Sequence, residues 1–163
     1  MKGKIIFATI FAILFLSSAA FSQGVVNQVI LPLSSAKLIA EAALDACVSK
    51  GFHTSVAVID RSGNLLVVLR DELAHPGTIE MAQMKAQTAV LFRRSTMEFQ
   101  ERTGEDASLT PQRDVPGILA LAGGVPIRFN GEIIGGIASS GSSQPMDDEC
   151  ARAGLAKAEE LMN

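Results

Sequence analysis

The stretch DVPGILALAGGVPIRFNGEIIGGIASSG, residues 114–141, carries the clearest strand signal in this chain of 163 residues. Val125–Phe129 is a short apolar run, and Glu132–Ser139 is a second one. Between them lies Asn130-Gly131, a dipeptide that accepts the positive φ required at both central positions of a type I′ turn. Two apolar runs joined in this way predict an antiparallel β-hairpin.

Glycine is dense in this stretch: Gly123 and Gly124 precede the first run, and Gly135 and Gly136 lie inside the second. Glycine inside a strand marks a bulge or a place where another group approaches the backbone closely. Either a helix or a neighbouring subunit packs on a smooth strand, or a flat ligand lies against it. The second interpretation makes Gly123 and Gly124 candidate ligand contacts.

The rest of the chain alternates between helical and strand patterns. Helices are expected from Ser34 or Ser35 to Lys50, over 79–92 behind a Thr78 cap, over 95–103, and from about Pro145 to Met162, and a second hairpin is expected from His53–Asp60 and Leu65–Arg70. Residues 104–114 are polar and are expected to form an irregular loop. Helices separated by hairpins predict an α+β domain, with helices packed on an antiparallel sheet.

The N-terminus has the pattern of a secretory signal peptide over residues 1–22. Lys2 and Lys4 precede the apolar run Ile5–Leu16, and Ala20-Phe21-Ser22 supplies small residues for cleavage. We therefore expect an exported protein, periplasmic or secreted, with a single domain over residues 23–163. No later segment is long and apolar enough to predict a membrane span.

Composition and motifs exclude several classes of function. The formal charge is −3, and losing Lys2 and Lys4 would make it −5, so no electrostatic attraction to nucleic acid is expected. The sequence has no GxGxxG, GxxxxGK, CxxC, HxxxH or GxSxG motif, which argues against phosphate loops, zinc sites and serine hydrolases. An enzyme is therefore less expected than a binding protein.

Two sets of residues have an ordinary structural interpretation. Cys47 and Cys150 lie on Ala-rich helix stripes, so we expect buried free thiols, with a disulfide as the alternative. The acidic run Asp147-Asp148-Glu149 is expected to cap the start of the last helix.

His75 is the most distinctive candidate for chemistry. It lies beside Pro76 in a predicted loop, where it is either a solvated surface residue or an axial ligand for a metal or haem iron. His53, at a strand start, is expected to be structural. Arg113, with Arg70, Arg93 and Arg94, either pairs with carboxylates of a ligand or lies on the surface.

Three segments together resemble the GlcG/HbpS family, small haem-binding domains that also form the C-terminal part of some corrinoid adenosyltransferases. They are SVAVIDRSGNLLVVLR at 55–70, TIEMAQMKAQTA at 78–89 with a KAxTA pattern, and residues 114–151, which contain VPG, AGGVPI and GGIASSG. The similarity covers nearly all of residues 23–163.

The resemblance implies a profilin-like fold with a five-stranded antiparallel sheet flanked by helices, and homo-oligomers from dimer to octamer. It implies haem as the cofactor and places the iron near Thr110 and His75, with Arg113 as the propionate partner. One segment departs from the family pattern: Asp71-Glu72-Leu73-Ala74-His75 replaces a common Asp-Gly-Ala, which adds an imidazole.

The sequence therefore predicts an exported, non-catalytic protein that binds haem reversibly through a loop axial ligand, for capture, storage, supply or sensing. One alternative is an enzyme or accessory protein that acts on a small hydroxy acid or aromatic compound in a glycine-lined cleft. Another is a structural oligomer without a small ligand.

Overall fold

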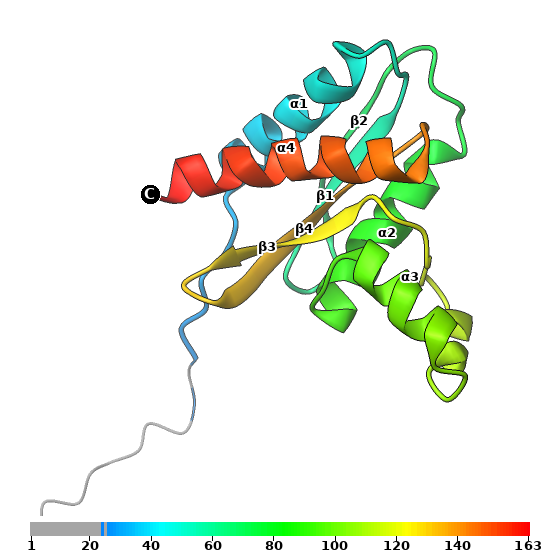
Figure 1. Cartoon of the computed structure of the whole chain (residues 1–163). Helices are drawn as coiled ribbons and strands as arrows, with labels where there is room; N and C mark the ends of the chain where they lie inside the picture. Colours follow the sequence, from blue (N-terminus) through cyan, green and yellow to red (C-terminus); the bar gives the residue numbers. More distant parts are fainter. Residues whose placement is uncertain (1–23, 25) are drawn as a thin grey trace, which may run out of the picture.

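A computed structural model describes residues 24 and 26–163, so the predicted signal peptide lies outside the described residues (Figure 1). In chain order the elements are α1 (Leu33–Val48), β1 (Ser55–Asp60), β2 (Leu65–Arg70), α2 (Thr78–Phe92), α3 (Thr96–Glu105), the 3₁₀ helix η1 (Thr110–Asp114), β3 (Gly124–Phe129), β4 (Glu132–Ser140) and α4 (Gln144–Met162). None of the helices in the described part has the length and hydrophobicity needed to cross a membrane.

The four strands form one antiparallel sheet in the order β2-β1-β4-β3. This confirms the α+β class and both predicted hairpins. The expectation of five strands is wrong for the described residues: the predicted segments account for all four strands, and residues 26–32, ahead of α1, form none.

The turn between β3 and β4 forms for the reason that its sequence suggests. Asn130 has a φ of 49° and Gly131 a φ of 81°, so both central residues are left-handed. The turn sets a register in which Val125 pairs with Ile137, after a shift between Ile127 and Arg128.

Helices cover both faces of the sheet. Figure 1 shows α1 and α4 side by side over one face, while α2 lies behind the sheet and α3 extends below it. The larger apolar core lies between the sheet and the α1–α4 pair, and includes Ile39, Ala43, Val56, Val58, Ile127, Ile137 and Ala151. A smaller cluster of Ile59, Ala86, Ala138 and Val90 lies under α2. Strand β1 is therefore buried on both faces.

Glycines let α2 approach the sheet closely. A Cβ atom on Gly124 would lie 2.5 Å from the carbonyl oxygen of Lys85, and one on Gly136 would lie 2.9 Å from that of Ala86. Real Cβ atoms do not approach this closely, so side chains at these positions would push the helix away. Of the two interpretations of the glycine-rich stretch, a packed helix or a flat ligand, the packed helix thus explains Gly124 and Gly136.

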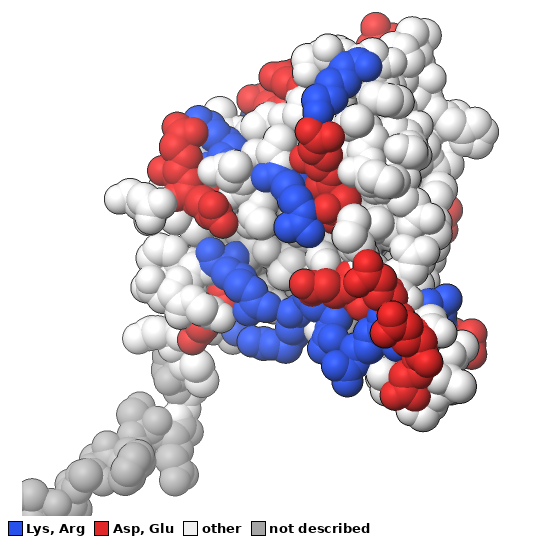
Figure 2. Space-filling model, viewed as in Figure 1, with Lys and Arg blue, Asp and Glu red and all other residues white. Residues whose placement is uncertain are grey.

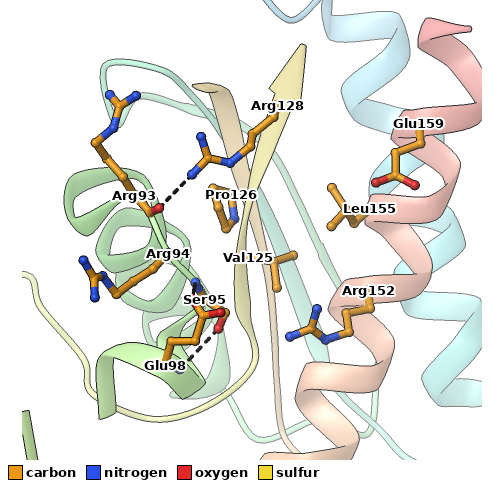
Figure 3. Close-up of a pocket in the computed structure, with 10 residues that line it drawn as sticks. All are labelled: Arg93, Arg94, Ser95, Glu98, Val125, Pro126, Arg128, Arg152, Leu155 and Glu159. Atoms are coloured by element: carbon orange, nitrogen blue, oxygen red, sulfur yellow. Dashed lines mark hydrogen bonds between the residues drawn. The ribbon is translucent and has the colours of Figure 1, made fainter. Parts of the chain in front are cut away.

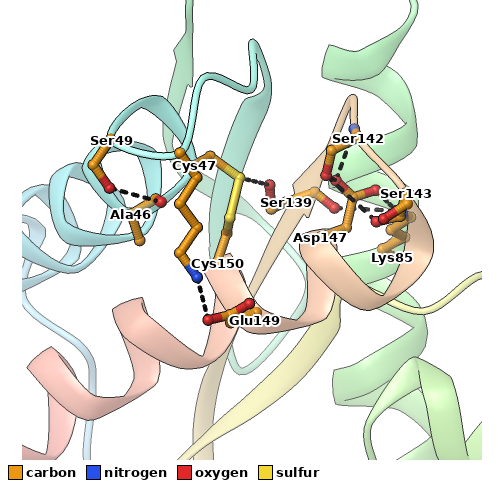
Figure 4. Close-up of a disulfide and its surroundings, with 11 residues drawn as sticks. Ala46, Cys47, Ser49, Lys85, Ser139, Ser142, Ser143, Asp147, Glu149 and Cys150 are labelled. Atoms are coloured by element: carbon orange, nitrogen blue, oxygen red, sulfur yellow. Dashed lines mark hydrogen bonds and ion pairs between the residues drawn. A yellow bond between two sulfur atoms is a disulfide. The ribbon is translucent and has the colours of Figure 1, made fainter.

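A disulfide joins α1 to α4, so the expectation of two free thiols is wrong (Figure 4). Cys47 and Cys150 are both buried, and their Cα atoms are 5.6 Å apart. The two helices meet along small residues, and a Cβ on Gly154 would lie 2.8 Å from the carbonyl oxygen of Ile39. This close helix contact brings the two cysteine-bearing stripes together. The sequence of either helix alone does not reveal that they meet.

We expect loss of the disulfide to lower the free energy of unfolding by about 2–4 kcal/mol, since the bridge closes a long loop in the unfolded chain. Denaturant unfolding of Cys47→Ala, Cys150→Ala and the double variant measures this. Each single variant already breaks the bridge, so the double variant should be hardly less stable than either. Additive losses, or a midpoint for the unsubstituted protein that a reductant leaves unchanged, would contradict a stabilising bridge.

Candidate ligand-binding site

His75 lies in the loop between β2 and α2, as the sequence predicts, and is exposed. The backbone N–H of Gly77 donates to its Nδ1 atom over 3.2 Å. The hydroxyl of Thr78 donates to the His75 carbonyl oxygen over 2.6 Å. The loop therefore holds the imidazole at the N-terminal end of α2.

The Gly77 hydrogen bond determines which imidazole nitrogen of His75 has a free lone pair. A backbone N–H can only donate, so Nδ1 of His75 accepts and the neutral ring carries its proton on Nε2. An iron atom bound at Nε2 would need the other tautomer. Ligation through Nε2 thus costs the 3.2 Å hydrogen bond from Gly77, which favours weak rather than tight ligation.

His53 has the opposite arrangement, and the sequence interpretation missed it. Its Nδ1 atom lies 2.9 Å from Oδ1 of Asp71, which also accepts the backbone N–H of Leu73 over 2.8 Å. An ionised carboxylate only accepts, so His53 carries a proton on Nδ1 and, when neutral, leaves the Nε2 lone pair free. A carboxylate behind the ring is the usual partner of a metal-binding histidine. The side chain is 46% exposed.

His53 and His75 lie at the same end of the sheet. The N–H of Asp71 donates to the carbonyl oxygen of Thr54 over 3.0 Å, and the hydroxyls of Ser55 and Thr78 are 2.8 Å apart. These bonds hold the start of β1 against the loop that carries His75. The hairpin pairs Ser55 with Arg70, so continuing this register by two residues places His53 opposite Glu72, and the chain after β2 brings the Asp71 carboxylate to the His53 ring.

Thr110 and Arg113 lie in η1, where both are tied to the end of α3. The Thr110 hydroxyl donates to the Thr103 carbonyl oxygen over 3.1 Å. Arg113 donates from Nε to the Thr103 hydroxyl over 2.7 Å and from Nη2 to the Gln100 carbonyl oxygen over 2.6 Å. The structure brings these two residues together, but Figure 1 shows η1 well apart from the loop before α2 that carries His75.

Gly123 and Gly124 lie beside a buried ion pair. Nζ of Lys85, from α2, is 2.8 Å from Oδ2 of Asp147, from α4, and donates to the Ser139 carbonyl oxygen over 3.1 Å (Figure 4). A Cβ on Gly123 would lie 2.7 Å from Cβ of Asp147 and 3.0 Å from the Lys85 Nζ atom. The role of these glycines in haem contact stays a prediction, and their Cβ sides face protein.

Asp147 lies in the first turn of α4, as expected for the acidic run, but its carboxylate is buried in this ion pair. Its Oδ1 atom accepts from the N–H and the hydroxyl of Ser142 over 3.0 and 2.7 Å. Burial lowers the pKa of Lys85 from its usual 10.5, and the negative charge of Asp147 offsets only part of that effect.

Among residues 24 and 26–163, no group of three or more His, Cys, Asp or Glu side chains is placed to hold a metal ion. A cofactor that already contains its metal ion needs fewer metal ligands from the protein. Haem iron takes one axial imidazole, and a free Nε2 lone pair, as in His53, fits that requirement.

The comparisons identify the family. The model of the family described as "Haem degrading protein HbpS-like" matches residues 31–156. Protein GlcG of Escherichia coli strain K12 is 34% identical over 116 residues, which cover 70% of this chain and 84% of GlcG. The chain belongs to the HbpS-like family.

Solved structures agree with this assignment. The crystal structure of HbpS has a TM-score of 0.79 and 40% identity, and the match covers 85% of this chain and 96% of that one. The crystal structure of a PduOC:haem complex has a TM-score of 0.73 and 25% identity, and the match covers 79% of this chain and 95% of that one. The resemblance to the GlcG/HbpS family is therefore confirmed.

We predict that Lys85→Met and Asp147→Asn each lower the free energy of unfolding by about 3–5 kcal/mol, because each leaves one buried group without its partner. Denaturant unfolding measures the loss. The double variant Lys85→Met/Asp147→Asn should recover much of it. If the two single losses simply add in the double variant, the pair does not act as a unit.

The pair also predicts a pH dependence. The native pKa of Lys85 lies below 10.5, so between the native pKa and 10.5 the unfolded chain binds more protons than the native protein. Stability should therefore rise with pH through this window and stay level with respect to this group below it. Unfolding measured at several pH values up to about 10 should show the rise, and the double variant should lack it.

Proposed function

We propose that this member of the HbpS-like family is an exported protein that binds haem reversibly, for capture, storage, supply or sensing. The match to the family over residues 31–156 is the observation that carries the proposal. The similarity to a PduOC structure whose name includes bound haem supports it. Bound haem would supply an iron atom that accepts a neutral imidazole nitrogen.

An imidazole at the N-terminal end of α2 is the proposed axial ligand. The sequence favours His75, which lies on the exposed loop. The hydrogen bonds favour His53, whose Nδ1–H is held by Asp71 and whose Nε2 lone pair is free in the neutral ring. Since His75 must give up its bond from Gly77 to present Nε2, we place His53 first and keep His75 as the alternative.

The proposed propionate contact is Arg113, with Thr110 beside it in η1. Nε and Nη2 of Arg113 already donate to the end of α3, which fixes the guanidinium and leaves Nη1 to donate to a carboxylate. Because Figure 1 shows η1 apart from the loop between β2 and α2, the two halves of the proposed site need separate tests.

Two observations support export. Residues 1–22 have the pattern of a signal peptide. The Cys47–Cys150 disulfide suits an oxidising compartment, since such bridges are rare in the cytosol. A homo-oligomer, from dimer to octamer, is also proposed. Large apolar side chains that a subunit contact could cover are exposed at Ile30, Leu33, Leu73 and Leu91.

A hemin titration of residues 23–163, followed at the Soret band, tests the proposal. We expect a saturable shift at one haem per chain or per pair of chains. The chain has two histidines, so His53→Ala and His75→Ala form a matched pair. His53→Ala should abolish or shift the haem spectrum, and His75→Ala should change it less. The reverse order would restore His75 as the ligand.

Further measurements separate the other parts of the proposal. Arg113→Gln should weaken hemin binding without moving the Soret maximum, while the exposed Arg102→Gln serves as the charge-matched control. The family description names haem degradation, and steady loss of the Soret band with a reductant and oxygen would indicate that reaction instead. If hemin gives the same spectra with the unsubstituted protein as in buffer alone, haem binding is refuted.

A further inference from the structure

The two edge strands of the sheet differ in how their outer backbone groups are used. In the order β2-β1-β4-β3, β2 and β3 each have one side that no strand of the described chain covers. Unpaired N–H and C=O groups along such an edge form a template for pairing with another chain. Proteins therefore protect their edge strands with proline, charged side chains or a covering segment.

The edge of β3 is protected. The Ser139 N–H donates to the Gly123 carbonyl oxygen over 2.9 Å, and this bond fixes the alternation along the strand. Gly124 and Pro126 therefore direct their backbone groups away from β4. The N–H of Gly124 donates to the Thr96 hydroxyl over 2.9 Å, and Pro126 has no N–H. No ordinary ladder of hydrogen bonds can form on this edge.

Charged side chains also border β3. The pocket over this strand is lined by Arg94, Val125 and Arg152, together with Glu98 and Glu159 (Figure 3). Figure 2 shows basic and acidic side chains gathered over this part of the molecule. Charges on an edge oppose the addition of a further strand.

The edge of β2 lacks these protections. The Asp71 N–H donates to the Thr54 carbonyl oxygen over 3.0 Å. The same alternation then directs the backbone groups of Val68 and Arg70 away from β1. Among the described residues, no turn or loop backbone forms a hydrogen bond to these groups. The strand contains no proline, and residues 65–69 carry no charge.

Apolar side chains are exposed along the same edge. Leu65 at the start of β2 is 46% exposed, Val68 near its middle is 36% exposed, and Leu73 in the loop after it is 69% exposed. The residues opposite Leu65 and Val68 on β1 are Ile59 and Ala57, and both are buried. The layer that buries β1 therefore does not extend over β2.

The one charged residue of β2 is bonded to its own chain. Nη2 of Arg70 donates to the carbonyl oxygens of Glu72 and Ala74. In an antiparallel pair of β2 strands, the two Arg70 side chains lie toward opposite ends. Two copies can therefore meet along this edge without placing like charges opposite each other, although the chain has a formal charge of −3.

We propose that β2 pairs edge to edge with β2 of a second copy of this chain, in an antiparallel pair that joins the two four-stranded sheets into one. A strand edge is complementary to an antiparallel copy of itself, because both copies present the same alternating donors and acceptors. The protected edge of β3 ends the joined sheet at two copies. The inference rests on the homo-oligomer proposed above and identifies its contact, and it does not require haem.

The size of the contact identifies the side chains that belong to it. A strand of six residues spans about 20 Å, and a stable dimer buries about 800 Å² per partner. Backbone pairing alone is too small, so side chains beside the edge must also be covered. Antiparallel pairing places the start of each β2 beside the end of the other, which brings Leu65 near the partner's Leu73.

Val68→Lys tests the proposal by analytical ultracentrifugation of residues 23–163. Lysine on an exposed edge opposes strand pairing, so we expect the dissociation constant of the dimer to rise at least about tenfold. Val115→Lys is the matched control, since Val115 is 43% exposed and lies outside the sheet. It should leave the assembly unchanged.

Amide hydrogen exchange, followed by NMR, shows whether the edge itself is covered. In the dimer the outward N–H of Arg70 should be protected, as the inward N–H of Leu69 is by its bond to β1. In Val68→Lys the Arg70 amide should lose its protection while the Leu69 amide keeps it. This pattern separates a lost contact from a damaged fold, in which both amides would exchange faster.

Two results would overturn the proposal. An oligomer whose mass Val68→Lys leaves unchanged would remove β2 from the interface, while the proposed homo-oligomer would stand. An unsubstituted protein that is monomeric at NMR concentrations, with an unprotected Arg70 amide, would overturn both. Hemin titration of the same variant measures haem binding separately, so a failed interface does not count against it.

Discussion

The ion pair between Lys85 and Asp147 fixes how the layers of this domain meet. Lys85 belongs to α2, on one face of the sheet, and Asp147 belongs to α4, which lies over the other face. They meet beside the Ser139 carbonyl oxygen near the end of β4. A buried pair of this kind adds little net stability over an apolar contact, but separating its members is costly. The pair therefore acts mainly by fixing where α4 starts relative to α2.

The glycines next to this pair follow from the same constraint. The space that a side chain at 123 would need is filled by Asp147, the Ser139 carbonyl oxygen and the Lys85 Nζ atom. At Gly124 the backbone of Lys85 itself occupies the equivalent space. The close approach of α2 to the sheet places Lys85 within reach of Asp147. The glycine-rich stretch and the KAxTA pattern thus supply the two surfaces of one contact, between the sheet and α2.

The sequence could predict those features of the fold that residues close together in the chain determine. Asn130-Gly131 sets the β3–β4 turn, and Ser95 with Glu98 starts α3 through a capping box, so these elements lie where they were expected. The Cys47–Cys150 bridge and the Lys85–Asp147 pair join residues far apart in the sequence, and both depend on helix packing. No local pattern shows which helix faces meet. Thiols on two small-residue stripes look the same bonded or free.

Some features of the candidate site can likewise be predicted from the sequence, and others require the structure. His75 can be singled out from its place beside Pro76, but its hydrogen bond from Gly77 and the tautomer that follows need coordinates. His53 looks like an ordinary strand start until β2 places Asp71 behind its ring. Continuing the hairpin register places His53 opposite Glu72, so the sequence pattern does not predict the contact with Asp71. The pocket lined by Arg94, Val125 and Arg152 could not be predicted, because its walls come from α2–α3, β3 and α4.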